Sequence, residues 1–257
     1  MAQKIKNFIL SISFFIIILV AWQLLCTFGV LTPWVVSSPN QTFLSFIKII
    51  GDGTLVKLLT VSFLNIFPAF ILAVIMALIL GILVGVNNTF RKMFSPFLSA
   101  IYLVPSLAWL PLIILFLGFT RQSIWAIIFI SSFIRIIYNV IGGVRGVNQN
   151  WLLAAKNLEL NKLDTIIKVI IPGALPQIIS GIRIGFGSAW RSLIGAEMLV
   201  ITAGGLGKYI WMSQWAFKSE QVLSGIITIA LVGIIVEEFI FKKIEKITLV
   251  KWGMVQE

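Results

Sequence analysis

The longest uncharged segment of the chain covers residues 58–90, where 33 consecutive positions hold no Asp, Glu, Lys or Arg. About 20 apolar residues are enough for a helix to cross the hydrocarbon core of a bilayer, where backbone polar groups must bond within the segment. The whole chain is 59% hydrophobic and 11% charged, whereas soluble domains have roughly 45–50% apolar and about 25% charged residues. The sequence therefore predicts an all-α, polytopic membrane protein.

Five further segments have a similar length and apolar character, so we expect about six transmembrane helices in a single domain over residues 1–257. Lys4 and Lys6 precede the first segment, as in a signal peptide. Its apolar stretch exceeds the usual roughly 7–15 residues and no small-x-small cleavage pattern follows, so we expect a retained helix. The predicted spans are residues 8–30, 60–87, 94–118, 122–143, 174–199 and 221–241.

The distribution of Lys and Arg predicts the orientation, because cytoplasmic loops carry the excess of these residues. With the N-terminus inside, twelve fall on the cytoplasmic side, five fall outside and three lie within spans. An even number of spans then places both termini in the cytoplasm. The cytoplasmic set is Lys4, Lys6, Arg91, Lys92, Arg145, Lys156, Lys162, Lys168, Lys242, Lys243, Lys246 and Lys251, and the outer set is Lys48, Lys57, Arg121, Lys208 and Lys218.

Composition also narrows the chemistry. Histidine, the commonest metal ligand and general base, is absent, so we expect no metal site, no catalytic site and no cofactor. Cys26 is the only cysteine, which rules out a disulfide within the chain. The net charge of +11 would suit nucleic acid only on a soluble basic face. Basic residues that flank spans explain this charge, and no nucleic-acid partner is expected.

Two loops are long. In the outer loop, residues 31–57, Phe43, Phe46, Ile47 and Ile50 have the spacing of one helical face, which predicts a short surface helix. The cytoplasmic loop, residues 145–172, is the more informative of the two.

Within the cytoplasmic loop, Asn148 can cap a short helix, and Asn161 with Asp164 resembles a capping pair that opens a second helix. An apolar face on the first helix needs a cover. It either lies on the lipid surface or docks into a groove of a partner protein, and periodicity does not decide between them. The predicted face consists of Trp151, Leu152, Ala155 and Leu158.

Several short strings in and around this loop form a recognisable pattern: Ala154-Ala155, Leu158-Glu-Leu160, Val169-Ile-Ile-Pro172, Ser188-Ala-Trp-Arg191, Ala196-Glu-Met198 and Pro105-Ser-Leu-Ala-Trp-Leu-Pro111. With these strings, the loop resembles the coupling loop of ATP-binding cassette importer permeases, whose pattern is Glu-Ala-Ala, three residues, Gly, nine or ten residues, then Ile-x-Leu-Pro. The similarity extends from about residue 37 to Trp252 and is closest to the branch that imports nitrate, taurine and alkanesulfonates.

The resemblance implies a type I importer permease with a cytoplasmic coupling helix in a bacterial inner membrane. It implies two cytoplasmic ATPase subunits, an outer substrate-binding protein, and a second copy of the chain or a paralogous permease. Two positions depart from the pattern: Leu153 stands where the family has Glu, and Glu159 where it has Gly, so Glu159 is expected to extend the helix or shift its end. The implied coupling residues are Trp151, Ala154, Ala155, Leu158, Glu159, Leu160 and Pro172.

Nucleotide binding is not expected on this chain. The nearest string to a phosphate-binding loop, residues 204–209, lacks the first Gly at the required spacing and ends in Tyr, so it is predicted to shape an outer turn. Glu237 and Glu238 lie beside Lys242 and Lys243, which favours a solvated ion-pair cluster.

Polar residues inside the spans are the candidates for the translocation pathway. Arg at a helix centre costs about 2.5–3.5 kcal/mol on insertion scales, so it usually faces water or a partner. Arg135 and Arg191 either line the pathway and attract an anion, or pair with a carboxylate or carbonyl of a neighbouring helix. The predicted pathway set is Arg191, Arg135, Asn139, Glu197 and Trp109.

Small residues and prolines predict packing. The pairs Gly81 with Gly85 and Gly181 with Gly185 are each four apart and indicate close helix contacts. Pro105 and Pro111 are expected to bend the third span.

The function expected from these observations is a permease subunit of an ATP-binding cassette importer for a small, anionic solute such as a sulfonate, taurine or nitrate. A secondary transporter or channel that works without an ATPase is the alternative. The absence of acidic residues deep in the spans argues against proton coupling. An embedded enzyme is disfavoured by the lack of His and of clustered carboxylates.

Overall fold

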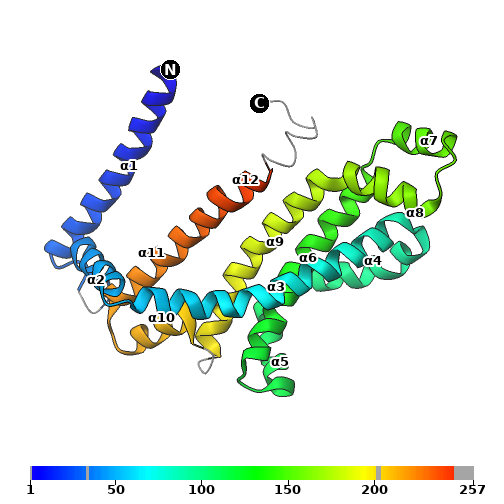
Figure 1. Cartoon of the computed structure of the whole chain (residues 1–257). Helices are drawn as coiled ribbons and strands as arrows, with labels where there is room; N and C mark the ends of the chain where they lie inside the picture. The colour runs from blue at the N-terminus through cyan, green and yellow to red at the C-terminus, as the bar shows by residue number, and fades with distance from the viewer. Residues whose placement is uncertain (1, 33–34, 201–203, 246–257) are drawn as a thin grey trace.

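The computed structural model describes residues 2–32, 35–200 and 204–245, with the backbone alone for residues 2–9, 11, 12 and 15. Lys246 and Lys251, and the side chains of Lys4 and Lys6, therefore lie outside the description. The described part consists of helices and their connections, with no strand (Figure 1). In order, these are α1 (Ala2–Thr27), α2 (Pro39–Gly51), α3 (Thr54–Val86), α4 (Asn88–Leu103), the 3₁₀ turn η1 (Ser106–Trp109), α5 (Leu110–Leu117), α6 (Arg121–Arg145), α7 (Gln149–Asn157), α8 (Lys162–Thr165), the π turn η2 (Ile166–Ile170), α9 (Ile171–Leu199), α10 (Gly205–Trp215), α11 (Ser219–Ile235), the π turn η4 (Val236–Phe241) and α12 (Lys242–Glu245).

Four continuous helices in the described residues are long and apolar enough to cross a membrane: Thr54–Val86, Arg121–Arg145, Lys162–Leu199 and Ser219–Glu245. The bent pair of α4 and residues Ser106–Leu117 makes a fifth if it counts as one span. Helix α1 is 26 residues long and contributes the shorter apolar stretch Ile16–Thr27. The count of six spans stays a prediction.

The span predicted at residues 94–118 is broken in the structure. Helix α4 ends at Leu103, and the chain turns by 95° before η1 and α5. Pro105 lies in this break, and its missing N–H cannot continue a helix, which confirms the predicted bend there. Pro111 lies in the first turn of α5, where no N–H is needed, so it does not add a second bend.

The helix predicted to start near residue 174 begins much earlier. Helix α8, the π turn η2 and α9 run on as one helix from Lys162 to Leu199. In the π turn, the N–H of Ile171 donates to the carbonyl of Ile166, and Pro172, which has no N–H, follows directly. A widened turn next to a proline is a common way for a helix to continue past it.

Helices α3, α6 and α9 form the centre of the bundle, with α6 packed between the other two. The glycine pairs confirm their predicted role as helix contacts. A Cβ at Gly81 or Gly85 would lie 2.7 Å from Val140 or Val144 of α6, and a Cβ at Gly185 would lie 2.5 Å from Ile136. Such close backbone approach requires glycine.

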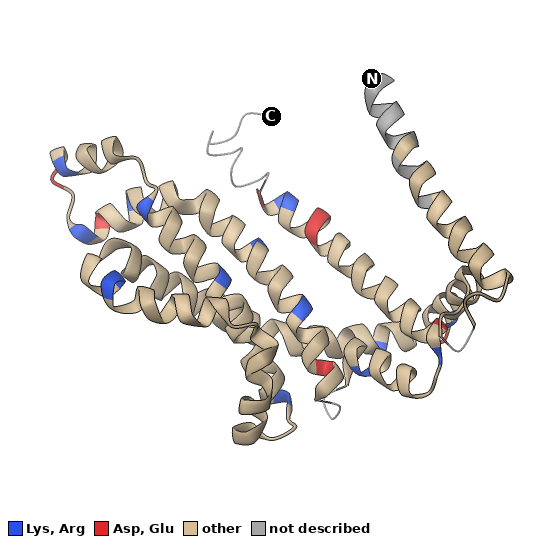
Figure 2. Ribbon diagram, turned by 180° about the vertical axis from the view of Figure 1, so that it is seen from behind, with Lys and Arg blue, Asp and Glu red and all other residues tan. Residues whose placement is uncertain are grey.

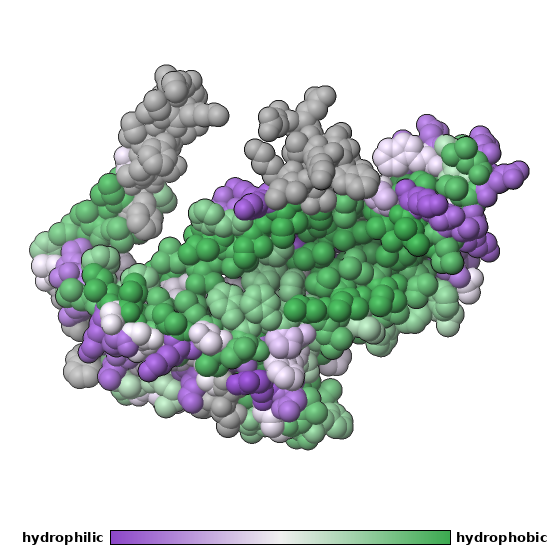
Figure 3. All heavy atoms as spheres, in the orientation of Figure 1, coloured by the Kyte–Doolittle hydropathy of each residue, from purple (hydrophilic) through white to green (hydrophobic). Residues whose placement is uncertain are grey.

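The surface is organised as an apolar band between polar ends (Figure 3). Large exposed hydrophobic side chains cover the helix sides, as expected where lipid is the solvent. The start of α1, helix α12 and the α7–α8 loop lie toward one side of the molecule, and α2 and α10 lie toward the other (Figure 1). Blue Lys and Arg segments gather in the α7–α8 region in Figure 2.

Helix α2 is the short helix predicted in the outer loop. Its start is fixed by a capping box in which Ser38 and Gln41 bond each other's backbone N–H. Phe43, Ile47 and Ile50 remain exposed, so this apolar face points away from the bundle.

Candidate translocation hollow and coupling loop

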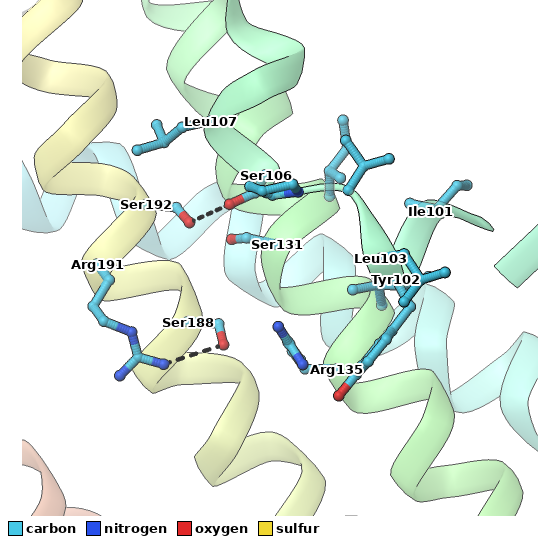
Figure 4. Close-up of a pocket in the computed structure, with 14 residues that line it drawn as sticks. Ile101, Tyr102, Leu103, Ser106, Leu107, Ser131, Arg135, Ser188, Arg191 and Ser192 are labelled. Carbon is cyan, nitrogen blue, oxygen red and sulfur yellow. Dashed lines mark hydrogen bonds between the residues drawn. The ribbon is translucent and has the colours of Figure 1, made fainter. Parts of the chain in front are cut away.

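A hollow of about 390 Å³ lies where the break between α4 and η1 meets α6 and α9 (Figure 4). Because α4 stops at Leu103 and η1 starts at Ser106, only Val104 and Pro105 lie outside a helix, and the segment around them lines the hollow beside α6 and α9. Irregular backbone at membrane depth is tolerated where it is covered by protein or lines a wet cavity. The polar residues that line the hollow are Ser106, Ser131, Arg135, Ser188, Arg191 and Ser192.

Arg135 projects from the middle of α6 and is half-buried. Its guanidinium carbon lies 4.4 Å from the centroid of the Tyr102 ring, a cation–π contact. Tyr102 packs edge-on against Tyr138, whose hydroxyl is 3.0 Å from the Ser99 hydroxyl. This contact holds the Arg135 side chain in place without neutralising its charge.

Arg191 projects from α9 into the other side of the hollow and is exposed. Its guanidinium donates a long, 3.5 Å hydrogen bond to the Ser188 hydroxyl. In the view of Figure 4, Ser188 lies between the guanidinium groups of Arg191 and Arg135. The hydroxyls of Ser106 and Ser192 are 2.8 Å apart and join the break to α9.

The third intramembrane arginine has a different environment. Arg183 forms ion pairs with Glu237 of η4 and with Glu245 of α12, the latter at 3.0 Å. Among the described residues, neither Arg135 nor Arg191 forms a salt bridge. Arg183 is therefore a paired cation, whereas Arg135 and Arg191, for which pairing was the alternative to a pathway role, line the hollow without a carboxylate partner among the described residues.

Glu237 and Glu238 form ion pairs with different partners. Glu238 forms the predicted solvated ion pair with Lys242, at 2.6 Å with both side chains about half exposed. Glu237 instead reaches across to Arg183 and fastens the end of α11 to α9.

Glu197 is fully buried, away from the lining of the hollow. Its carboxylate accepts hydrogen bonds from the Ser62 hydroxyl at 3.0 Å, the Asn65 amide at 2.9 Å and the backbone N–H of Gly207 at 3.0 Å. Ser62 in turn accepts from the N–H of Leu206. We call Glu197, Ser62, Asn65 and the α10 N-terminus the Glu197 cluster. It ties α3, α9 and α10 together.

The glycine string at residues 204–207, which was predicted to shape an outer turn, forms the N-cap and the first turn of α10. Gly204 and Gly205 have φ of 73° and 94°. A Cβ at Gly205 would overlap the Glu197 carboxylate, and one at Gly207 would overlap the carbonyl of Ile194. The missing side chains therefore let α10 start directly on Glu197.

The remaining pathway candidates lie outside the hollow. Asn139 donates to the carbonyl of Arg135 at 2.8 Å, and its Cβ packs against Gly181 at the crossing of α6 and α9. Trp109 is half-buried against the hydrophobic core. The pathway roles of Arg191, Arg135, Asn139, Glu197 and Trp109 stay predictions, and the geometry brings only the first two together.

Sequence reasoning missed the polar companions of the two arginines. Ser131 precedes Arg135 by four residues, and Ser188 precedes Arg191 by three, so each serine lies on the same helix face as its arginine. That spacing was a usable signal. Tyr102 and Ser106 carry no such signal, because only the 95° break brings them to the hollow.

The loop at residues 145–172 forms the two predicted helices. The Asn148 side chain caps α7, and Asn161 exchanges hydrogen bonds with Asp164 at the start of α8. The predicted single face of α7 is wrong: Ala155 is 3% exposed, whereas Leu158 is 74% exposed. Leu158 belongs to the turn after α7, so helical spacing no longer applies to it.

Apolar side chains are thus divided between two sides of the loop. Trp151 lies against Gly173, where a Cβ would be 3.2 Å from the indole, so α7 is fastened to the start of α9. Leu153, Leu158 and Leu163 are 58–74% exposed. Ala154 is exposed, and Leu160 and Pro172 are half-buried.

Glu159 ends α7 as a glycine would, instead of extending it. Its φ is 53°, in the left-handed region. The N–H of Glu159 donates to the carbonyl of Lys156, and the N–H of Leu160 donates to that of Ala155. This is the Schellman pattern, which favours glycine at the position of Glu159. The turn that the family pattern encodes is therefore kept despite the departure.

The fold and the hollow together define a multi-pass membrane transport component. A family model described as "Binding-protein-dependent transport system inner membrane component" matches residues 73–242. The chain belongs to this family: it is the permease subunit of an ABC importer, an inner-membrane protein and not an enzyme, with ATP hydrolysis on separate subunits. Membership implies ATPase and substrate-binding-protein partners and a dimeric assembly.

Similar proteins agree with this assignment. The chain is 33% identical to a putative ABC transporter permease of Methanocaldococcus jannaschii, covering 90% of this chain and 88% of the relative. It is 31% identical to the taurine transport system permease of Escherichia coli (89% and 84%) and 33% identical to a putative aliphatic sulfonates permease of Bacillus subtilis (92% and 84%). An inward-facing structure of the MetNI methionine ABC transporter has the same fold, with a TM-score of 0.64, 16% identity and coverage of 76% and 95%.

Proposed function

We propose that this permease imports a small anionic solute of the sulfonate, taurine or nitrate kind, and that the loop 145–172 transmits ATPase movement to the bundle. The observation that carries the proposal is that Arg135 and Arg191 line one hollow without a salt bridge to any described residue. Permeases for taurine, aliphatic sulfonates and nitrate, all anions or zwitterions with an oxyanion group, are among the similar proteins.

The coupling role of the loop is supported by its exposed apolar residues. Leu153, Leu158 and Leu163 project from a segment that is otherwise rich in polar side chains. Exposed apolar side chains of this kind suit a groove on a partner protein. Trp151 packs against Gly173 at the start of α9, α7 contacts η2, and the loop leads directly into the long helix that carries Arg191. A push on these leucines would therefore move the wall of the hollow.

The assembly we propose has two cytoplasmic ATPase subunits, a substrate-binding protein on the outer side, and a second copy of this chain or a paralogous permease. Both termini lie in the cytoplasm, together with the loop 145–172. The common side of α12, the start of α1 and the α7–α8 loop in Figure 1 supports this orientation. Thiol labelling of the variants Lys156→Cys and Lys218→Cys, each made in a Cys26→Ser background, tests this orientation. The cysteine at position 156 should react only with label added from inside, and the cysteine at position 218 only with label added from outside.

ATP-driven uptake by the reconstituted transporter tests the coupling role. Leu158→Asp should abolish binding of the ATPase subunits and uptake, because it places a charge in the proposed groove. Asn157→Asp is the matched control, since it adds the same charge at the neighbouring exposed position and should keep uptake. If Leu158→Asp keeps both ATPase binding and uptake, the coupling role is wrong.

A further inference from the structure

The environment of the hollow allows its ligand to be assigned a chemical class. Arg135 and Arg191 face it without a salt bridge among the described residues, and four serine side chains accompany them. A cation inside a membrane span is expensive unless water or an anion reaches it.

The described residues offer these arginines no free carboxylate within the spans. The chain has nine acidic residues, and those within the described spans are engaged elsewhere. Glu197 is held in the Glu197 cluster, Glu237 pairs with Arg183, and Glu238 pairs with Lys242. A second copy of the chain has the same sequence and the same engaged carboxylates. In a homodimer, the described residues of the second copy therefore supply no free intramembrane carboxylate for either arginine.

The geometry of the donors favours a group with several equivalent oxygens. Guanidinium groups are planar forks that bind oxyanions through two parallel N–H···O bonds. Arg135 is held by Tyr102 and Arg191 by no more than a 3.5 Å bond to Ser188. The hydroxyls of Ser106 and Ser192, which already bond each other, can each turn a hydrogen toward the hollow if that bond opens. The volume is at the small end for ligand sites.

We propose that this hollow is an oxyanion-binding station on the import path, in which Arg191 and Arg135 hold the sulfonate, nitrate or carboxylate group of the solute and the Ser106–Ser192 pair opens to admit it. The inference rests on the proposed function, since it names the part of the solute that the hollow recognises. Arg191 is the principal ligand, because its guanidinium is exposed and has the fewest contacts. Arg135 is pre-positioned by Tyr102.

The same chemistry is offered by a lipid headgroup phosphate, and the experiment separates the two sources. The permease is purified in complex with its ATPase subunits and placed in nanodiscs of phosphatidylcholine, with or without phosphatidylglycerol. Binding of methanesulfonate and of nitrate is measured by calorimetry, without the substrate-binding protein. Arg191→Gln and Arg135→Gln are compared with Arg183→Gln, which removes an intramembrane cation outside the hollow.

Binding by the wild type in phosphatidylcholine that weakens at least tenfold in Arg191→Gln and Arg135→Gln, but stays within twofold in Arg183→Gln, supports the proposal. Arg191→Lys should recover part of the affinity, because it restores the charge without the fork. Equal binding by wild type and Arg191→Gln overturns it. So does an absence of methanesulfonate and nitrate binding together with phosphatidylglycerol that copurifies with wild type and not with Arg191→Gln, because the site then holds lipid.

The proposed function is tested separately by ATP-driven uptake with the binding protein present. If uptake depends on Leu158 but the hollow binds no oxyanion, the binding-station proposal is wrong and the proposed importer function stands. If the hollow binds oxyanions but no ATP-driven uptake occurs, the proposed importer function is wrong and the binding site stands.

Discussion

The Glu197 cluster and the hollow lined by Arg135 and Arg191 differ in how far the protein satisfies its own polar groups. In the cluster, the Glu197 carboxylate is fully buried and accepts three hydrogen bonds from groups of α3 and α10. In the hollow, two guanidinium groups have a ring and a distant hydroxyl as their contacts. A polar group that the protein satisfies completely belongs to its structure, whereas a charge that it leaves unsatisfied next to a cavity is available for a ligand.

Arg183 shows that the chain can satisfy an intramembrane arginine where structure requires it. Its partners come from η4 and α12, so the ion pairs fasten the last helix to α9. The same helix α9 therefore carries a paired cation at one level and an unpaired one, Arg191, two turns further on. We infer that Arg183 has a structural role and that Arg191 binds a ligand.

The largest effect on stability is expected from Glu197→Ala. The substitution leaves the Ser62 hydroxyl, the Asn65 amide and the Gly207 N–H buried without their acceptor, and each unsatisfied group costs about 1–3 kcal/mol. We expect a loss of about 3 kcal/mol or more, seen as a large fall in the apparent melting temperature of the purified protein. Glu238→Ala, which removes an exposed, paired carboxylate, should change stability by less than about 0.5 kcal/mol. Similar melting temperatures for the two variants would contradict the structural role of the cluster.

An intermediate, opposite effect is expected from Glu159→Gly in the coupling loop. A left-handed backbone conformation costs a non-glycine residue roughly 1 kcal/mol. Glycine should therefore stabilise the turn after α7 and slow amide hydrogen exchange at Leu160, whose N–H closes it. Glu159→Ala serves as the control, because it removes the same charge and keeps the Cβ. Equal exchange in the two variants would show that strain at this position is not the cause.

The smallest effect on stability is expected from the double substitution Ser106→Ala with Ser192→Ala. Removing both members of a hydrogen bond leaves no unsatisfied partner, so stability should stay within about 0.5 kcal/mol. Affinity for methanesulfonate should fall two- to fivefold if the hydroxyls bind the oxyanion. Unchanged affinity would show that the arginines bind the oxyanion without the two serine hydroxyls.

Much of the fold could be predicted from the chain, because charge-free segments, glycine pairs and Pro105 act through local rules. The all-α fold, the contacts at Gly81 and Gly185, and the bend at Pro105 are confirmed, and four of the predicted apolar segments form long continuous helices. The break itself could not be placed, since a proline in a membrane helix permits either a mild kink or a 95° turn.

The site could be predicted only in part. Arg135 and Arg191 stood out as charges inside apolar segments, but which intramembrane arginine is paired depends on where α11 and α12 lie. The Glu197 cluster was missed for the same reason: Glu197 and Ser62 are 135 residues apart, and their bond follows from tertiary packing alone. Leu158 was misplaced because α7 ends one residue before it.

The most direct test of the distinction between paired and unpaired arginines measures uptake and melting temperature on the same preparations of Arg191→Gln and Arg183→Gln. We predict that Arg191→Gln lowers the ATP-driven uptake rate at least tenfold and leaves the melting temperature unchanged. Arg183→Gln should lower the free energy of unfolding by about 1 kcal/mol, because it removes partly exposed ion pairs, and the melting temperature should fall accordingly. It should keep most of the uptake. If Arg191→Gln instead lowers the melting temperature as much as Arg183→Gln and transports normally, Arg191 is a structural residue and the hollow is not the binding station.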